Sequence, residues 1–165
     1  MSVSIRAYQE DDLPFLHEIN VASTPGVSDE TEEALARIIS ISTCLVLVDE
    51  AEFAIGFINL IEPGTMAYAS ANLRWFEAWL KVYPQRLIYV DRIALHPDAR
   101  RKRYGKLLYQ AAFDAFDGYE SIGCEVNTLP DNPGSHHFHK QMGFKRVGDQ
   151  TFTPEKAVAY YVRQL

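Results

Sequence analysis

The chain has 165 residues, of which 47% are hydrophobic, and a formal net charge of −6 at pH 7. This length suits a single domain over residues 1–165 with a substantial core, and the acidic balance argues against a nucleic-acid-binding protein. The first residues lack the apolar run of a signal peptide and no apolar stretch approaches membrane-spanning length, so we expect a cytoplasmic protein without a membrane partner.

The N-terminal part of the sequence predicts a strand, two helices and a hairpin. Asp11 and Asp12 are suited to cap the first helix, and the segment from Thr24 to Gly26 breaks the chain after it. The second helix has acidic residues in its first turn and an apolar stripe behind them. The predicted segments are a strand at 5–8, helices beginning near 13 and near 29, and hairpin strands at 43–48 and 53–61.

An aromatic segment separates the third strand from the fourth. Residues 72–83 carry aromatic and aliphatic side chains at helical spacing and stop before Pro84, so they predict a helix. An aromatic stripe at this spacing favours core packing or a contact in a homodimer.

Residues 87–116 contain the clearest functional signal, a strand followed by a basic turn and a helix. Residues 87–95 are rich in β-branched and aliphatic side chains and predict a largely buried strand. From Tyr104 onward an apolar stripe predicts a core-facing helix. Cations at a helix start are electrostatically misplaced unless an anion binds there, so the turn predicts a phosphate or pyrophosphate site rather than a solvated helix start. The cations are Arg100, Arg101, Lys102, Arg103 and Lys106.

The C-terminal part predicts three further strands and one short helix. The strand at 122–127 precedes a turn at 130–134, which leads into a short helix ending near Met142. Strands at 144–152 and 157–162 complete the chain. Cys44 and Cys124 lie in apolar strand-like segments and are too few for a disulfide framework, so we expect buried thiols.

The basic turn resembles the cofactor loop of the GNAT N-acetyltransferases, which transfer an acetyl group from acetyl-CoA to an amine. The family signature is Gln/Arg-x-x-Gly-x-Gly/Ala, and the match here runs from Arg100 through Tyr104 to Gly105, with Arg103 replacing the first glycine. An ordinary residue serves at that position if its backbone needs only right-handed helical geometry. The resemblance implies an α/β (α+β) fold: one domain with a mixed, mostly antiparallel sheet of about seven strands, flanking helices, and a helical insertion between strands 3 and 4.

A second segment resembles the same family. Residues 132–144 are similar to its Asn-x-x-Ala-x-x-Leu-Tyr-x-x-x-Gly-Phe pattern, in which the asparagine commonly contacts the CoA arm. Asn132 occupies the asparagine position, Ser135 the alanine position and His139 the tyrosine position, and Phe138 precedes that histidine. The resemblance implies that Asn132, Ser135 and Phe138 bind acetyl-CoA together with the basic turn. His136 and His139 share a helix face, but no third ligand stands at metal spacing, so we expect no metal.

Acetyl transfer to an amine requires oxyanion donors, a base and an acid. For the donors, the resemblance points to the backbone at Ile93, Ala94 and Leu95. Asp91 is the first candidate base, because strand alternation places it on the face of Ile93 and Leu95 and turns Arg92 to the opposite face.

The base and the acid both have alternatives. Asp91 in an ion pair that holds the core is the alternative to its role as base, and Glu125, on the next predicted strand, is a second candidate base. His139 is the candidate acid for the departing thiolate. An imidazole that only packs or hydrogen-bonds against the cofactor is equally compatible with the sequence.

The function predicted is acetyl transfer from acetyl-CoA to the primary amine of a small molecule or peptide. A non-catalytic acyl-CoA-binding sensor is the alternative, because residues 103 and 139 depart from the family pattern. A nucleotide-binding protein is a third possibility. The aromatic residues of 72–83 form either part of the acceptor wall or plain core.

Overall fold

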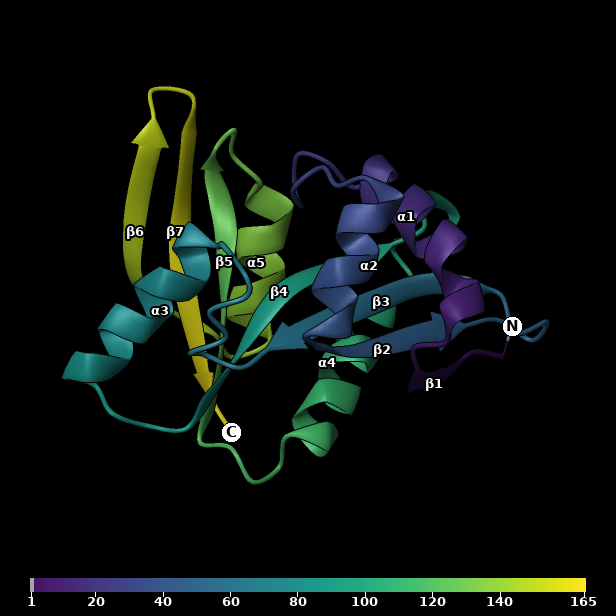
Figure 1. Cartoon of the computed structure of the whole chain (residues 1–165), viewed down its shortest axis with the longest axis horizontal. Coiled ribbons are helices and arrows are strands. Elements are labelled where there is room, and N and C mark those ends of the chain that lie inside the picture. The colour runs from purple at the N-terminus through teal and green to yellow at the C-terminus, as the bar shows by residue number, and fades with distance from the viewer. Residues whose placement is uncertain (1) are drawn as a thin grey trace.

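The computed structural model describes residues 2–165 and confirms the predicted fold (Figure 1). Its seven-stranded sheet has the order β1-β2-β3-β4-β5-β7-β6. Neighbouring strands are antiparallel except β4 and β5, which are parallel. The strands are β1 (Ser4–Ala7), β2 (Thr43–Val48), β3 (Ala54–Ile61), β4 (Leu87–Leu95), β5 (Ser121–Leu129), β6 (Lys145–Thr153) and β7 (Lys156–Gln164).

Five α-helices in residues 2–165 cover the two faces of the sheet (Figure 1). Alternate residues of β2 face opposite sides: Val46 packs with α1 and α2, whereas Leu47 packs with α4. No helix in this described part of the chain is long and apolar enough to cross a membrane. The helices are α1 (Leu13–Ala22), α2 (Glu32–Ser40), α3 (Ala71–Val82), α4 (Tyr104–Ala115) and α5 (Pro133–Gln141).

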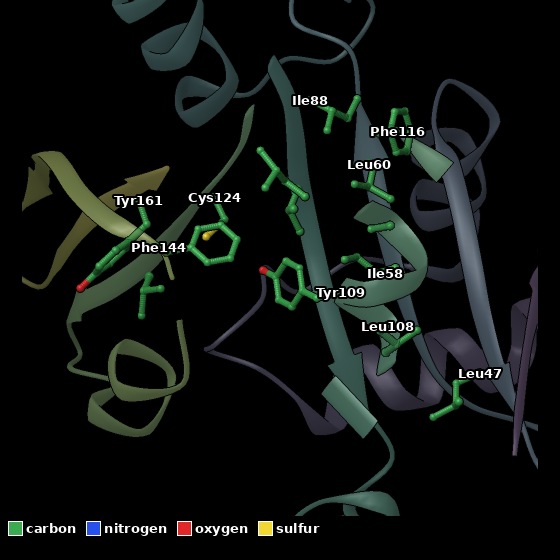
Figure 2. Packing of buried hydrophobic residues seen from close by; sticks show 14 of the residues in the cluster. Leu47, Ile58, Leu60, Ile88, Leu108, Tyr109, Phe116, Cys124, Phe144 and Tyr161 are labelled. Carbon is green, nitrogen blue, oxygen red and sulfur yellow. The ribbon is translucent and has the colours of Figure 1, made fainter. Parts of the chain in front are cut away.

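The largest core cluster lies between the sheet and the helices α4 and α5. Tyr109 of α4 is fully buried beside Cys124 of β5 and Phe144, which follows α5 (Figure 2). Both cysteines are free and buried, as predicted, and burial raises the pKa of the Cys44 thiol to about 12.

The aromatic helix α3 belongs to the core. The ring of Trp75 stacks on Tyr160 of β7 at a centroid distance of 3.9 Å, and Phe76 is fully buried. A Cβ at Gly148 of β6 would lie 2.4 Å from the Trp75 ring, so this glycine permits the close approach of α3 to the sheet. The structure therefore supports core packing for these residues rather than an acceptor wall.

Two predicted helix starts differ from the structure. The second helix begins at Glu32 rather than near 29, because the Thr31 hydroxyl accepts a hydrogen bond from the Ala34 amide and caps it there. Asp12 does not cap α1 through its side chain. Its carboxylate instead accepts hydrogen bonds from Arg6 and from the Gln9 amide.

The parallel pair β4 and β5 opens the sheet. The two strands pair only where Leu87–Tyr89 meets Ser121–Gly123, and beyond this they diverge (Figure 1). Each strand keeps its outer partner, since β4 stays paired with β3 and β5 with β7. The divergence leaves a gap in the middle of the sheet, at the C-terminal end of β4.

Candidate functional site

The gap between β4 and β5 opens into a cavity of about 1150 Å³. Two groups of residues line it. We call one the helix side, formed by the lining residues of the segments 93–95, 100–105 and 132–139. The other, which we call the loop side, consists of the lining residues of the segments 24–30, 68–72 and 91–92 together with Glu125, Asn127 and Lys156.

Most of the predicted site residues line this one cavity. Lys102 and Lys106 do not, because their exposed side chains lie outside it. Arg100 does, but its guanidinium donates to the Ala22 carbonyl at 3.2 Å, at the end of α1. The predicted residues in the lining are Asp91, Ile93, Ala94, Leu95, Arg100, Arg101, Arg103, Tyr104, Gly105, Glu125, Asn132, Ser135, Phe138 and His139.

The helix side contains an uncapped helix start. No side chain caps α4, so its first N–H groups are available to an anion. Arg103, the residue before the helix, has φ 63° and ψ 21°, which is left-handed geometry. A non-glycine residue is unstrained in right-handed geometry, so the backbone at Arg103 is strained. A Cβ at Gly105 would lie 3.2 Å from the Phe138 ring, so this glycine lets α4 approach α5 closely. The donors, the cations and the close packing together fit a pyrophosphate.

The backbone of β4 presents a free edge to the cavity. Ile93, Ala94 and Leu95 pair with Ile58, Phe57 and Gly56 of β3. On the other side of β4, pairing with β5 ends at Tyr89. Alternate N–H groups of a strand point to opposite neighbours, so N–H groups on the β5 side of this segment have no strand partner and can donate to a ligand.

A β-bulge at Asp91 corrects the predicted facing of Arg92. Arg92 is opposite Asn59 and Val90 is opposite Leu60, so Asp91 is an extra residue on β4. A bulge breaks strict side-chain alternation. Arg92 consequently donates through Nε to Asp91 Oδ2 at 2.7 Å, and the prediction that it points away was wrong.

The Asp91 carboxylate accepts four hydrogen bonds. Oδ1 accepts from Tyr68 Oη at 2.5 Å and from Arg92 Nη2 at 3.5 Å. Oδ2 accepts from Arg92 Nε and, at 3.2 Å, from Asn59 Nδ2. A carboxylate has about four acceptor sites, so no free site of Asp91 remains for a substrate proton.

Glu125 is a carboxyl group with an open acceptor site. Tyr89 Oη donates a hydrogen bond to Oε1, and within residues 2–165 no donor is in contact with Oε2. The pKa of Glu125 is raised to about 8. Desolvation is the largest cause of this rise, and the Tyr89 hydrogen bond and the Lys156 charge offset part of it. Near neutral pH the group therefore exchanges protons readily.

His139 is a neutral, buried imidazole. Burial lowers its pKa below the ordinary histidine value. Nδ1 lies 2.8 Å from the Ser135 carbonyl, which can only accept, so Nδ1 carries the proton. Nε2 then accepts from Tyr109 Oη at 2.7 Å. The His139 N–H proton is thus hydrogen-bonded to the Ser135 carbonyl. The other exchangeable proton of the Tyr109–His139 pair belongs to the Tyr109 hydroxyl.

Several cavity residues were not found from the sequence. Asn127 donates through Nδ2 to the Pro25 carbonyl at 2.7 Å and accepts from Lys156 Nζ at 2.7 Å. Tyr68 and Tyr109 lie in the lining as well. These residues carry no motif. The available signal was positional: Asn127 lies on a predicted strand, Lys156 lies just before one, and Tyr109 lies on the helix predicted after the basic turn.

Two of the three histidines of α5, His136 and His139, are held by hydrogen bonds within the protein. His136 Nε2 donates to the Asn127 carbonyl at 2.9 Å and Nδ1 accepts from Tyr161 Oη at 2.7 Å. In residues 2–165 no group of three or more His, Cys, Asp or Glu side chains is arranged to hold a metal ion.

Comparison with known proteins identifies similar sequences and folds. Residues 13–144 match the model of the acetyltransferase (GNAT) family. No curated protein matches the sequence. Among solved structures, Ard1 from Thermoplasma volcanium has 17% identity and a TM-score of 0.76, with 100% of this chain and 99% of that chain covered.

Two further solved structures are similar in fold and contain ligands. A phosphinothricin acetyltransferase from Sinorhizobium meliloti in complex with AcCoA has 20% identity, a TM-score of 0.72, and 100% and 89% of the two chains covered. Spermidine N-acetyltransferase from Vibrio cholerae in complex with CoA and spermine has 19% identity, a TM-score of 0.70, and 98% and 95% covered.

Proposed function

Because the chain belongs to the GNAT acetyltransferase family, we propose that it transfers the acetyl group of acetyl-CoA to a primary amine of a small molecule or peptide. One observation carries this proposal: a single cavity contains both an uncapped, cation-flanked helix start and the Glu125 carboxyl. The first suits a phosphorylated cofactor, and the second suits an amine that must lose a proton. We also keep the predictions of one domain over 1–165, a homodimer and a cytoplasmic location.

Acetyl-CoA supplies an activated thioester, and the residues that would hold it lie on the helix side. The first N–H groups of α4 with Arg101 and Arg103 suit the pyrophosphate. The N–H groups of Ile93 to Leu95 that face away from β3 suit the thioester carbonyl and the charge that develops on it. The two fold neighbours solved in complex with AcCoA and with CoA support acetyl-CoA as the cofactor.

We propose Glu125 rather than Asp91 as the base. The acceptor ammonium first transfers a proton to Oε2 of ionised Glu125. Its nitrogen then bonds to the acetyl carbon as the carbon–sulfur bond breaks, and the second proton that the nitrogen loses passes to solvent. An alkylammonium has a pKa near that of lysine, about 10.4. Proton transfer to a glutamate at its ordinary value of 4.5 costs about 8 kcal/mol, whereas at about 8 it costs about 3 kcal/mol.

The departing thiolate needs a hydrogen-bond donor until it takes a proton from solvent, and we propose that Tyr109 is this donor. In the structure the Tyr109 hydroxyl donates to Nε2 of the neutral His139 ring, and it would turn from Nε2 to the sulfur as the carbon–sulfur bond breaks. His139 is then a positioning residue that acts on Tyr109, a role that differs from both of those predicted for it. Burial raises the pKa of Tyr109 well above its ordinary value, so this hydroxyl stays protonated at the pH of the reaction.

The experiment that tests the proposed function is CoA release from acetyl-CoA, followed as free thiol. Amino acids, polyamines, aminoglycosides, arylamines and short peptides are offered as acceptors. Acceptor-dependent thiol release supports the transferase. Tight binding of acetyl-CoA without release by any acceptor would indicate a sensor, and competition by ATP as strong as by CoA would indicate a nucleotide-binding protein.

The pH profile tests Glu125 as base. With Glu125 ionised only above about pH 8, kcat/KM for the acceptor should rise up to that pH and then level off. This rise of kcat/KM with pH, the limb of the profile, should have its midpoint near pH 8 for acceptors of different amine pKa. It should be absent in Glu125→Gln. A limb that follows the pKa of each amine would mean that the amine is deprotonated in solution, and Glu125 would lose this role.

A further inference from the structure

Lys156 places an ammonium group on the loop side of the cavity. Its Nζ donates to Asn127 Oδ1 at 2.7 Å, and Asn127 is fixed in turn by the Pro25 carbonyl. An ammonium has three donors, so two remain for a ligand. In the part of the chain that the structure describes, no ion pair includes Lys156.

The other cavity cations are already engaged or belong to the helix side. Arg92 directs its guanidinium at Asp91, Asn20, Ser28 and Tyr68, which occupies its five N–H donors. The arginines at 100, 101 and 103 lie in the turn before α4. Lys156 is therefore the loop-side cation, among the described residues, with donors to spare.

The formal charges of the loop side balance one another. Glu30 and Asp91 are opposed by Arg92 and Lys156, with Arg92 Nη2 4.0 Å from Glu30 and its Nε 2.7 Å from Asp91. Glu125 is largely uncharged at pH 7. A polyamine would add two or more positive charges to a lining that has no net charge. A zwitterion adds no net charge, so it matches this lining better.

Lys156 and Glu125 line the same side of the cavity. Glu125 and Asn127 are two residues apart on β5 and so face the same side, about 7 Å apart along the strand. Asn127 holds the Lys156 ammonium, and that ammonium is near enough to influence the Glu125 carboxyl. Both side chains line the same cavity, so one small ligand can contact the Lys156 ammonium with one end and the Glu125 carboxyl with the other.

We propose that the acceptor is an amine that carries a carboxylate, a free amino acid or a close analogue, whose carboxylate binds Lys156 while its amine faces Glu125. This inference rests on the proposed acetyl transfer and specifies its substrate class. It sets a free amino acid apart from a peptide N-terminus, whose adjacent carboxyl group is tied up in an amide bond, and from a polyamine, which has no carboxylate at all.

The test compares each amino acid with its matched amine that lacks the carboxylate, such as phenylalanine with 2-phenylethylamine and methionine with 3-(methylthio)propylamine. The quantity measured is the ratio of kcat/KM for the amino acid to that for the amine. We expect a ratio above 10 in the wild type. Lys156→Met should lower it at least tenfold, mainly through KM, and Lys156→Arg should keep it within about threefold.

Matched controls separate specificity from folding. Lys145→Met removes an exposed lysine outside the cavity and should leave the ratio unchanged. Acetyl-CoA affinity, measured by calorimetry, should be equal in all variants and shows that each has folded. A wild-type ratio near 1, or an equal loss for both acceptors in Lys156→Met, would overturn the inference while acetyl transfer stands. Absence of thiol release with every acceptor would overturn the proposed function as well.

Discussion

The Glu125 carboxyl should make the protein less stable as pH rises, and Glu125→Gln should remove that dependence. Its pKa is about 8 in the native state against an ordinary 4.5. A group whose pKa is raised by folding contributes stability that is complete below the lower value and is lost as pH rises through the higher one. The window of loss is therefore pH 4.5 to 8. Glutamine keeps the shape and an acceptor for Tyr89 but cannot ionise.

The size of the effect follows from the same two pKa values. Each pH unit well inside the window costs about 1.4 kcal/mol. Because titration is incomplete at both ends of the window, the native state loses about 3.5 kcal/mol between pH 5 and pH 8 through this one group. For a domain of this length 1 kcal/mol corresponds to about 2–4 °C in Tm. Between pH 5 and pH 8 the Tm of Glu125→Gln should accordingly rise by about 7–14 °C relative to that of the wild type.

The assay is thermal unfolding followed by circular dichroism at half-unit steps from pH 5 to pH 9. The difference between variant and wild type isolates Glu125, because His139 and other titrating groups contribute to both. Glu18→Gln, at an exposed position of α1, is the control and should follow the wild type. If the two Tm curves run parallel, Glu125 is ionised throughout, and the argument for it as a base of pKa about 8 fails.

Three other substitutions test the packing around the cavity. Arg103→Gly removes a left-handed non-glycine residue and should raise stability by about 1 kcal/mol; a lower Tm would show that the Arg103 side chain stabilises the turn. Gly148→Ala places a methyl group 2.4 Å from the Trp75 ring and should cost about 1–3 kcal/mol in denaturant unfolding, and no cost would mean that α3 shifts freely. Arg92→Met leaves the buried Asp91 charge unpaired and should cost about 3 kcal/mol or more. Adding Asp91→Asn should recover part of that loss, and no recovery would place the cost elsewhere.

The sequence predicted the elements whose patterns are long and regular. The apolar stripes gave the helices α1 to α4, and the β-branched segment 87–95 matches β4 residue for residue. Element ends were less predictable because they depend on single hydrogen bonds. The Thr31 hydroxyl starts α2 three residues later than its acidic residues suggested.

The chemistry of the site was predictable only where it has a motif. The turn at 100–105 and the segment 132–139 have one, and both line the cavity. Strand alternation failed at Asp91, because a bulge depends on the register between two strands and leaves no mark in one strand's own sequence. Lys156 follows a turn at the start of β7, and only the pairing of β7 with β5 brings it to Asn127.

The buried pair of Asp91 and Arg92 connects β4 to the two loops that line the cavity. Through its hydrogen bonds Arg92 joins β4 to Asn20 of α1 and to Ser28 in the loop that follows, and Asp91 holds the Tyr68 hydroxyl. The pair therefore fixes both loops of the loop side.

Replacing Asp91 would loosen those loops and lower activity even if its carboxylate never accepts a substrate proton. A loss of turnover in Asp91→Asn is consequently no proof of general base catalysis. The two roles differ in the pH profile: loosened loops lower kcat/KM at every pH and keep the limb, whereas loss of the base removes the limb itself. With its acceptor sites filled, Asp91→Asn should keep the limb near pH 8 that Glu125→Gln abolishes.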